Sequence, residues 1–528
     1  MKAYNIFILN IIFIFFGCNT FTKPINKDFN DFKFLEIDII ALNNGYKNGD
    51  FTIEEVIKAY IERIEKIDQN GPRLNSVIEI NPEAISIAKA LDQELKNNGS
   101  RGHLHGVPIL LKDNIDTNDQ MSTTAGSRAL AGSKPLKDSK VAEKLRKAGA
   151  VILGKANLSE WANFRGKRST SGWSGINGQT KNPYVLTRNP CGSSSGSGVS
   201  VSANLTLLAI GTETNGSIVC PSTVNGVVGI KPTVGLISRS GIIPISYTQD
   251  TAGPMARSVQ DAAICLGFLT GVDENDKKTI TSLVNTYDDY TQFLNKNGLK
   301  GKRIGVYSGP LGLNDKVDSL FKKSVDLIKK MGAEIIEIET VSSSEARSHS
   351  FQVMIHEYKD GLNNYFKSLG KNSPIKDLEE LIEFNKNDSI ELKYFNQAYL
   401  EIAQNTDGIK SEKYLNSLSE LKRLSREEGI DKVMDDNNLD AIIAPTGSPA
   451  WSTDWFNGDN YHISSSSPSA WAGYPIISVP MGNIHGLPVG MSFFGRAWSE
   501  PILIEISYAF EQSSKARIIP NFHINDEY

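Results

Sequence analysis

Two hydrophobic patterns alternate along the chain, and this alternation restricts the possible folds more than any other feature of the sequence. Apolar residues recur every three or four positions over residues 52–67, which predicts a helix, and Thr52 with Glu55 forms a capping box at its start. Short apolar runs at residues 107–112 and 150–153 indicate buried strands. Helices that alternate with buried strands predict an α/β fold, in which helices cover both faces of a sheet.

Further segments continue both patterns. Helices are predicted over residues 82–96 and 141–149, and strands over residues 302–307, 333–338, 439–444, 476–480 and 489–494. Residues 341–436 are rich in charged residues and helix formers, and we expect a helical covering region there. Within that region, Glu357 either recognises a cation or faces solvent, and we favour solvent.

The composition excludes several classes of protein. With 40% hydrophobic and 22% charged residues among 528, the chain can bury a sizeable core, which excludes disorder. Its 56 basic and 60 acidic residues give a net charge of −4, which argues against nucleic acid as a main partner. His103 and His105 lie two positions apart, but the other histidines are scattered and no carboxylate cluster accompanies them. We therefore expect no metal site.

The first 31 residues differ from the rest of the chain. Residues 6–17 are apolar except for Asn10 and end directly at Cys18, a run too short to cross a bilayer as a helix. A small residue followed by cysteine at the end of such a run resembles the bacterial lipoprotein signal. We expect residues 1–17 to be a signal peptide, Cys18 to be lipidated and residues 18–31 to form a tether. The protein would then be exported and anchored to a membrane of the cell envelope. A plain cleaved signal and an uncleaved cytoplasmic start are the alternatives.

The remaining cysteines are Cys191, Cys220 and Cys265. An odd number excludes a complete set of disulfides. Because cysteine is among the most buried residue types, we expect buried free thiols.

Three segments hold residues suited to proton transfer, close backbone approach or anion binding. Lys112 ends an apolar run, where loss of water disfavours its charged form and favours a role as proton acceptor. Residues 189–198 are small and polar, so the backbone can pass close to other groups there. In residues 211–220 a strand-like run meets a turn whose N–H groups can bind an anion, and Ser217 would open the next helix. Taken singly, an ion-paired lysine and two ordinary turns would explain the same residues.

One local motif matches the pattern around the nucleophile of another class of enzyme. Residues 192–196 match the G-x-S-x-G pattern of an α/β-hydrolase, which would make Ser194 the nucleophile of an esterase. That motif requires a strand immediately before it, whereas residues 187–191 are polar, contain proline and predict a loop. We therefore expect no nucleophile of that kind.

Together the three segments resemble the amidase signature family in order and spacing. Lys112 lies in the family's K-D-N segment, Ser193 follows 81 residues later in the Gly- and Ser-rich stretch, and Ser217 stands 24 residues further on. The likeness continues through residues 224–259 and through the C-terminal segments AGYPIISVP and GLPVGMSFFGRAWSE. It implies a large twisted mixed β-sheet covered on both faces by helices, with residues 32–528 forming one amidase signature domain.

The sequence departs from the family pattern at a few positions. Cys191 and Ser195 replace glycines, and Glu213 stands where many members have Asp. The T-E-T-x-G-S variant is most similar to the bacterial peptide-amidase branch, although Asn215 replaces the Asp that is common there.

The resemblance also implies a mechanism. Ser217 would attack an amide carbonyl, Ser193 would relay its proton and neutral Lys112 would accept it, so that a linear amide is hydrolysed through an acyl-enzyme. The bond between Gly192 and Ser193 would be cis. The N–H groups expected in the oxyanion hole are those of Thr214, Asn215, Gly216 and Ser217, and Ser194 is expected to help orient the substrate.

The implied substrate is a small-molecule or peptide amide, with C-terminal peptide amides as one candidate, and no metal or organic cofactor is implied. Two other functions compete with this interpretation. One is that of the glutamyl-tRNA amidotransferase component that belongs to the same family, against which the export signal argues because charged tRNA is cytoplasmic. The other is a surface lipoprotein that only binds amide-bearing ligands.

Overall fold

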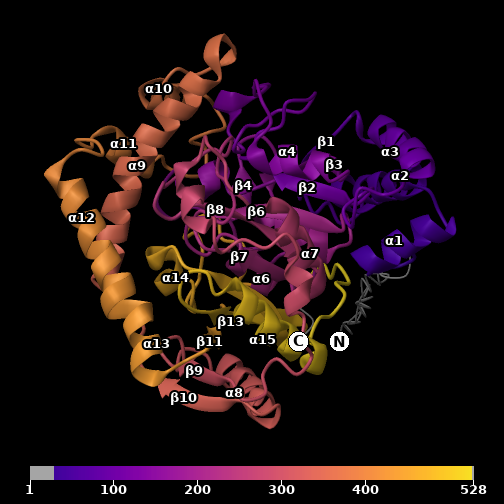
Figure 1. Ribbon diagram of the computed structural model, residues 1–528. Coiled ribbons are helices and arrows are strands. Elements are labelled where there is room, and N and C mark those ends of the chain that lie inside the picture. The colour runs from indigo at the N-terminus through magenta and orange to yellow at the C-terminus, as the bar shows by residue number, and fades with distance from the viewer. Residues whose placement is uncertain (1–28, 526–528) are drawn as a thin grey trace, which may run out of the picture.

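The computed structural model describes residues 29–525, which fold around one mixed sheet (Figure 1). Eleven strands lie in the order β1-β3-β2-β6-β8-β7-β12-β13-β11-β9-β10. The strands β3, β2 and β6 pair in parallel toward one end of the sheet, and β11, β9 and β10 do so at the other end. The central pairs and the edge pair of β1 with β3 are antiparallel. The expected mixed sheet is confirmed. The signal peptide expected at residues 1–17 and the lipidation site at Cys18 lie outside the described residues.

The seven predicted strands, which correspond to β2, β3 and β9 to β13, agree with the structure to within a few residues, whereas β1, β7 and β8 were not predicted as strands. The bounds of the strands in the large sheet are β1 Val77–Ile80, β2 Pro108–Lys112, β3 Val151–Ala156, β6 Leu208–Glu213, β7 Val228–Lys231, β8 Thr251–Ala256, β9 Arg303–Tyr307, β10 Glu334–Ile338, β11 Ala441–Pro445, β12 Ile476–Ile484 and β13 Leu487–Phe494. The short strands β4 (Trp173–Ser174) and β5 (Gly178–Gln179) form a separate pair.

Helices pack on both faces of the large sheet. The helices α5 (Ser195–Ser202) and α6 (Val219–Val224) pack on its central strands and on each other. The opposite face is covered by α4 (Lys140–Lys147), α7 (Val259–Leu269), α8 (Asp315–Lys330) and α15 (Glu500–Ser514). The helices α1 (Ile39–Asn48), α2 (Ile53–Arg63) and α3 (Ala84–Asn98) lie at the β1 end of the sheet.

The predicted capping box at the start of α2 is present. Thr52 Oγ1 accepts from the Glu55 N–H at 3.1 Å, and Glu55 Oε2 accepts from the Thr52 N–H at 2.8 Å. The α-helix is shorter than predicted, because the chain widens into a π-helical turn at Ile64–Gln69. Ile64 and Ile67 remain buried there, so the apolar spacing does not reveal the change in winding.

A layer of helices from residues 341–436 runs along one side of the molecule (Figure 1). It contains α9 (Ala346–Ser368), α10 (Leu378–Asn387), α11 (Ala398–Gln404), α12 (Glu412–Lys422) and α13 (Asp431–Asn437), while α14 (Ser467–Ala472) lies beyond it. Tyr358 and Leu362 of α9 belong to the same buried cluster as Trp161, which lies in a short 3₁₀ helix, and Ile243, which lies in a loop. This layer therefore packs on the segments that follow β3 and β7.

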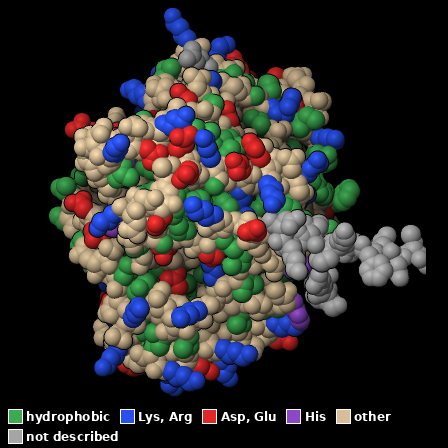
Figure 2. Space-filling model, turned by 90° about the vertical axis from the view of Figure 1, so that its right-hand side faces the viewer, with side chains coloured by type: hydrophobic (Ala, Val, Ile, Leu, Met, Phe, Trp, Pro, Cys, Tyr) green, Lys and Arg blue, Asp and Glu red, His purple; other side chains and the backbone are tan. Residues whose placement is uncertain are grey.

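None of the helices within residues 29–525 is both long and apolar enough to cross a membrane. On the face of the molecule shown in Figure 2, acidic and basic side chains lie among each other. Neighbouring charges of opposite sign largely cancel at a distance.

Candidate active site

Lys112 is the last residue of β2, and its side chain is fully buried. Its Nζ donates to Ser193 Oγ at 2.8 Å and to the carbonyl and hydroxyl oxygens of Thr212 at 3.1 and 2.8 Å. Burial lowers the pKa of Lys112 to about 7, although the carboxyl groups of Asp250 and Glu213 act in the opposite direction. A lysine with this pKa is partly neutral near pH 7 and can accept a proton.

Ser193 lies in the loop that precedes α5, and its side chain is fully buried. The Gly192–Ser193 peptide bond is cis, as the resemblance implied. The Ser193 carbonyl accepts from the Ser159 N–H at 3.0 Å, which anchors the loop next to β3. The structure thus brings Ser193 and Lys112 together from positions 81 residues apart.

Ser217 is partly exposed and lies in the turn between β6 and α6, two residues before the helix begins rather than at its first residue. Its carbonyl accepts from the Ser194 N–H at 3.1 Å, which places the turn beside the loop of Ser193. Among the hydrogen bonds of the described residues, none involves the Ser217 hydroxyl. This hydroxyl is therefore available to another molecule, and the expected chain from Lys112 to Ser217 is hydrogen-bonded only as far as Ser193.

The turn before Ser217 offers backbone donors, but one of the expected four is already engaged. The Gly216 N–H donates to Glu213 Oε1 at 2.8 Å. Within residues 29–525, the N–H groups of Asn215 and Ser217 donate to no acceptor, so they are free to bind an oxyanion. The Thr214 hydroxyl donates to Asp250 at 2.6 Å, which ties the turn to the loop that leads into β8.

Glu213 is a site residue whose role the sequence analysis missed. Besides the Gly216 N–H, its carboxylate accepts from the N–H groups of Ile218 and Val219 at 2.7 and 3.0 Å. A buried carboxylate that accepts from three backbone groups fixes the shape of the turn around Ser217. A carboxylate directly before a Gly-containing turn was the available signal, and it was noted only as a departure from the family pattern.

Ser194 is fully buried at the start of α5. Its hydroxyl donates to the Thr212 carbonyl at 3.0 Å and accepts from the Thr212 N–H at 3.2 Å. These two hydrogen bonds join α5 to β6 and occupy the hydroxyl that was expected to orient a substrate. The residues before Ser194 form no strand, which agrees with the rejection of an esterase elbow.

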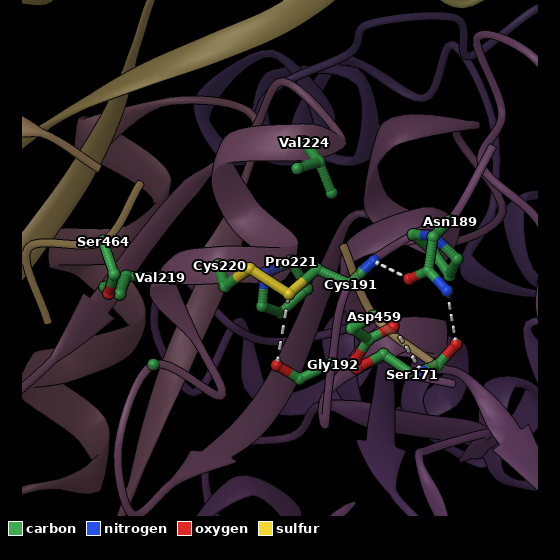
Figure 3. The surroundings of a disulfide bond; sticks show 12 residues. Ser171, Asn189, Cys191, Gly192, Val219, Cys220, Pro221, Val224, Asp459 and Ser464 are labelled. Atoms are coloured by element: carbon green, nitrogen blue, oxygen red, sulfur yellow. Dashed lines mark hydrogen bonds between the residues drawn. A yellow bond between two sulfur atoms is a disulfide. The ribbon is translucent and has the colours of Figure 1, made fainter. Parts of the chain in front are cut away.

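Cys191 and Cys220 form a disulfide, with an S–S distance of 2.02 Å and a Cα–Cα distance of 5.9 Å (Figure 3). The expectation of free thiols is therefore wrong for these two residues, whereas Cys265 is indeed buried and free. The odd number of cysteines excluded only a complete set of pairs. The fold decides which two approach each other, because it places the loop before Ser193 against α6.

Glu357 does not face solvent, which corrects the sequence interpretation. Its carboxylate is buried in α9 and accepts from Ser246 Oγ at 2.5 Å, Thr248 Oγ1 at 2.6 Å and Tyr414 Oη at 2.8 Å. The turn at residues 246–248 supplies donors that the local sequence around Glu357 does not reveal. These contacts fasten the helical layer to the loop that leads into β8.

A cavity of about 390 Å³ lies next to the hydrogen-bond partners of Lys112. Its lining includes Asn114 and Thr212, which are joined by a 3.0 Å hydrogen bond, together with Thr214 and Asp250. Burial raises the pKa of Asp250 to about 6, although hydrogen bonds from Thr214 and the 245–246 backbone act against it. Tyr365 of α9 closes another side of the cavity. The helical layer thus forms part of a chamber beside the lysine.

Among the described residues, no group of three or more His, Cys, Asp and Glu side chains is arranged to hold a metal ion. What the site does contain is an accessible serine, free backbone donors and a buried lysine that can lose its proton. These are the groups that acyl transfer requires.

Comparison with known proteins places the chain in a family. The family model described as Amidase matches residues 55–504. A probable amidase from Arabidopsis thaliana is 42% identical over 502 residues, which are 93% of this chain and 92% of the relative. The X-ray structure of native peptide amidase from Stenotrophomonas maltophilia has 46% identity and a TM-score of 0.90, and covers 93% of this chain and 99% of that one. The chain therefore belongs to the amidase family and is an amidase that acts on amides.

A second group of relatives has lower identity. A glutamyl-tRNA(Gln) amidotransferase component from Thermoanaerobacter pseudethanolicus is 32% identical over 510 residues, which are 92% of this chain and 98% of that protein. The family thus includes proteins named for a different reaction, so family membership by itself does not define the substrate.

Proposed function

We propose that this amidase hydrolyses linear carboxamides, including C-terminal peptide amides, through Ser217, Ser193 and Lys112. The observation that carries the proposal is the 2.8 Å hydrogen bond from the buried Lys112 Nζ to Ser193 Oγ, at a lysine whose pKa burial lowers to about 7. The polar contacts of this Nζ are with hydroxyl and carbonyl oxygens, so the lysine serves better as a base than as a structural cation.

The proposed reaction begins with attack of Ser217 Oγ on the amide carbonyl carbon. The Ser217 proton passes to Ser193, whose own proton passes to neutral Lys112. The carbonyl oxygen gains negative charge and accepts from the N–H groups of Asn215 and Ser217. A proton then returns through Ser193 to the amide nitrogen, the C–N bond breaks, and the acyl group remains on Ser217. After the amine or ammonia has left, water attacks the ester carbon and passes a proton through Ser193 to Lys112. The bond from Ser217 Oγ to the acyl carbon then breaks, the proton returns to Ser217 Oγ, and the carboxylic acid is released.

Two observations support a peptide amide as the substrate. The 46% identity to the Stenotrophomonas maltophilia peptide amidase covers nearly the whole of both chains. The cavity of about 390 Å³, whose lining includes Thr212, Glu213 and Thr214 just before the Ser217 turn, is a candidate site for groups attached to the carboxamide.

A panel of amides tests this proposal. The protein is incubated with C-terminally amidated peptides, aryl amides and fatty amides, and release of ammonia or amine is followed. We expect the peptide amides to show the highest kcat/KM. A preference for aryl or fatty amides would reject peptide amides as the substrate and would leave the assignment of amidase activity intact. If none of the amides is hydrolysed and a fluorophosphonate labels no serine, the alternative of a protein that only binds amides would be favoured. Co-purification of further subunits would favour the amidotransferase alternative.

We also propose that the protein is exported and anchored through lipid on Cys18. The apolar run at residues 6–17 that ends at this cysteine supports the proposal. The Cys191–Cys220 disulfide supports it as well, because disulfides persist in oxidising compartments.

Metabolic labelling tests the anchor. In a bacterial host fed radioactive palmitate, the full-length protein should be labelled and recovered with membranes. The Cys18→Ala variant should lose the label, whereas Cys265→Ala should keep it. An unlabelled full-length protein would reject the lipid anchor.

A further inference from the structure

The loops that carry Ser193 and Ser217 are joined covalently beside the proposed reacting hydroxyls. Cys191 lies two residues before Ser193, Cys220 lies three residues after Ser217, and their sulfurs are bonded. Figure 3 shows the disulfide passing from the loop of Gly192 to the first turn of α6. The proposed reaction uses neither sulfur, so the disulfide requires another explanation.

Noncovalent contacts between the same two segments are few. The Ser194 N–H donates to the Ser217 carbonyl at 3.1 Å. The Asn225 side-chain amide donates to the Pro190 carbonyl at 2.9 Å and to the Pro221 carbonyl at 2.7 Å. Pro190 and Pro221 adjoin the two cysteines in sequence, so Asn225 bridges the segments that the disulfide joins. Single hydrogen bonds of this kind contribute little to stability and break readily. The disulfide is covalent and does not open in this way.

Both loops are also held at the end of β6, because Lys112, which binds Ser193, donates to Thr212 as well, and Ser194 forms two hydrogen bonds with Thr212. The Ser193 loop is held by Lys112 of β2 and by Ser159, which follows β3. The Ser217 turn is held by Glu213 at the end of β6. These shared contacts are hydrogen bonds, whereas the disulfide is a covalent link between the two segments, so it limits more strictly how far one serine can move relative to the other.

The disulfide is packed on all sides rather than set at the surface. Cys191 and Cys220 are 6% and 3% exposed, and they share a buried cluster with Tyr184, Val224 and Trp451. Close packing transmits a displacement of one group to its neighbours instead of absorbing it. A change at this disulfide would therefore move the adjoining serines.

We propose that the Cys191–Cys220 disulfide is a positioning pair for amide hydrolysis: it limits how far the loops of Ser193 and Ser217 can move apart, so that the two hydroxyls can approach for proton relay when a substrate is bound. This inference rests on the proposed roles of the two serines. Reduction would give two thiols, with a dithiol reductant supplying two electrons and two protons and becoming a disulfide itself. The reduced enzyme would keep its substrate contacts and lose the alignment.

The double variant Cys191→Ala/Cys220→Ala in the full-length protein tests the proposal, with any amide that the wild type hydrolyses. Alanine adds no backbone strain at position 191, where φ is +54°, because cysteine and alanine share the same Cβ restriction. We expect kcat to fall about 10- to 100-fold, the loss typical of a displacement of about 1 Å in reacting groups. KM should change by less than about threefold, and the acidic limb of the pH profile should stay in place because Lys112 stays buried at the end of β2 and keeps its contacts with Thr212.

The remaining buried thiol supplies the matched control. Cys265→Ala should behave as wild type, and dithiothreitol should lower kcat in both but not further in the double variant. Alkylation in denaturant followed by mass spectrometry shows when Cys191 and Cys220 have been reduced. If the double variant fails to fold, the reduced wild type provides the same comparison.

A folded double variant, or a wild type shown to be reduced, that retains kcat within about twofold would overturn the positioning role and leave the disulfide as a stabiliser only. Failure of the proposed nucleophile is a separate result, because it would appear as activity that survives the loss of Ser217.

Discussion

Replacement of Ser217 by alanine is expected to abolish amide hydrolysis, with kcat reduced by about 10⁴-fold or more. Alanine removes the hydroxyl that attacks the carbonyl while leaving the Glu213 contacts that shape the turn. The side chain is partly exposed and has no hydrogen-bond partner among the described residues, so its loss leaves no buried group unpaired. The fold and the thermal unfolding midpoint should therefore stay close to those of wild type, as circular dichroism can show.

A second serine in the same region serves as the control. Ser222 lies in α6, and its hydroxyl donates to the Ile218 carbonyl at 2.7 Å. Ser222→Ala should retain activity within about tenfold, since it removes one buried hydrogen bond and no reacting group. A fluorophosphonate should label wild type and Ser222→Ala at residue 217. Labelling at Ser194 instead would revive the esterase interpretation, and near-normal turnover by Ser217→Ala would remove the proposed nucleophile.

Replacement of Lys112 by alanine is expected to lower kcat/KM by about 10³-fold or more, because the relay then has no terminal base. Lys112→Arg is the informative companion. Arginine keeps a positive charge and hydrogen-bond donors but does not lose its proton in proteins. Both variants should therefore be severely impaired. An active arginine variant would show that this position supplies charge rather than a base.

The pH profile of the wild type tests the same group without mutation. Only the neutral amine accepts a proton, and burial lowers the pKa of Lys112 to about 7. Activity should be high above that pH and fall by about tenfold per pH unit below it, with the acidic limb in kcat/KM reporting the free enzyme. A profile that stays flat well below pH 6 would contradict a lysine base.

The local patterns of the sequence were sufficient for the α/β class and for most strand positions. Apolar runs such as residues 107–112 must be buried wherever the chain goes, so β2 at Pro108–Lys112 follows from composition and length alone. The same reasoning placed Lys112 at the end of a buried strand, where loss of hydration lowers its pKa. The spacing of the three segments and their resemblance to the amidase signature family then identified Ser193 and Ser217 as candidate site residues.

Contacts between distant segments were beyond that reasoning. The pairing of Cys191 with Cys220, the burial of Glu357 and the three N–H groups bound by Glu213 each depend on where other parts of the chain come to lie. Local periodicity reports only whether a side chain prefers to be buried, and it carries no information on its partner. The sequence by itself determined which residues could react, whereas packing of the loops against the sheet decided which of them meet, because hydrogen bonds and disulfides require approach within a few ångströms.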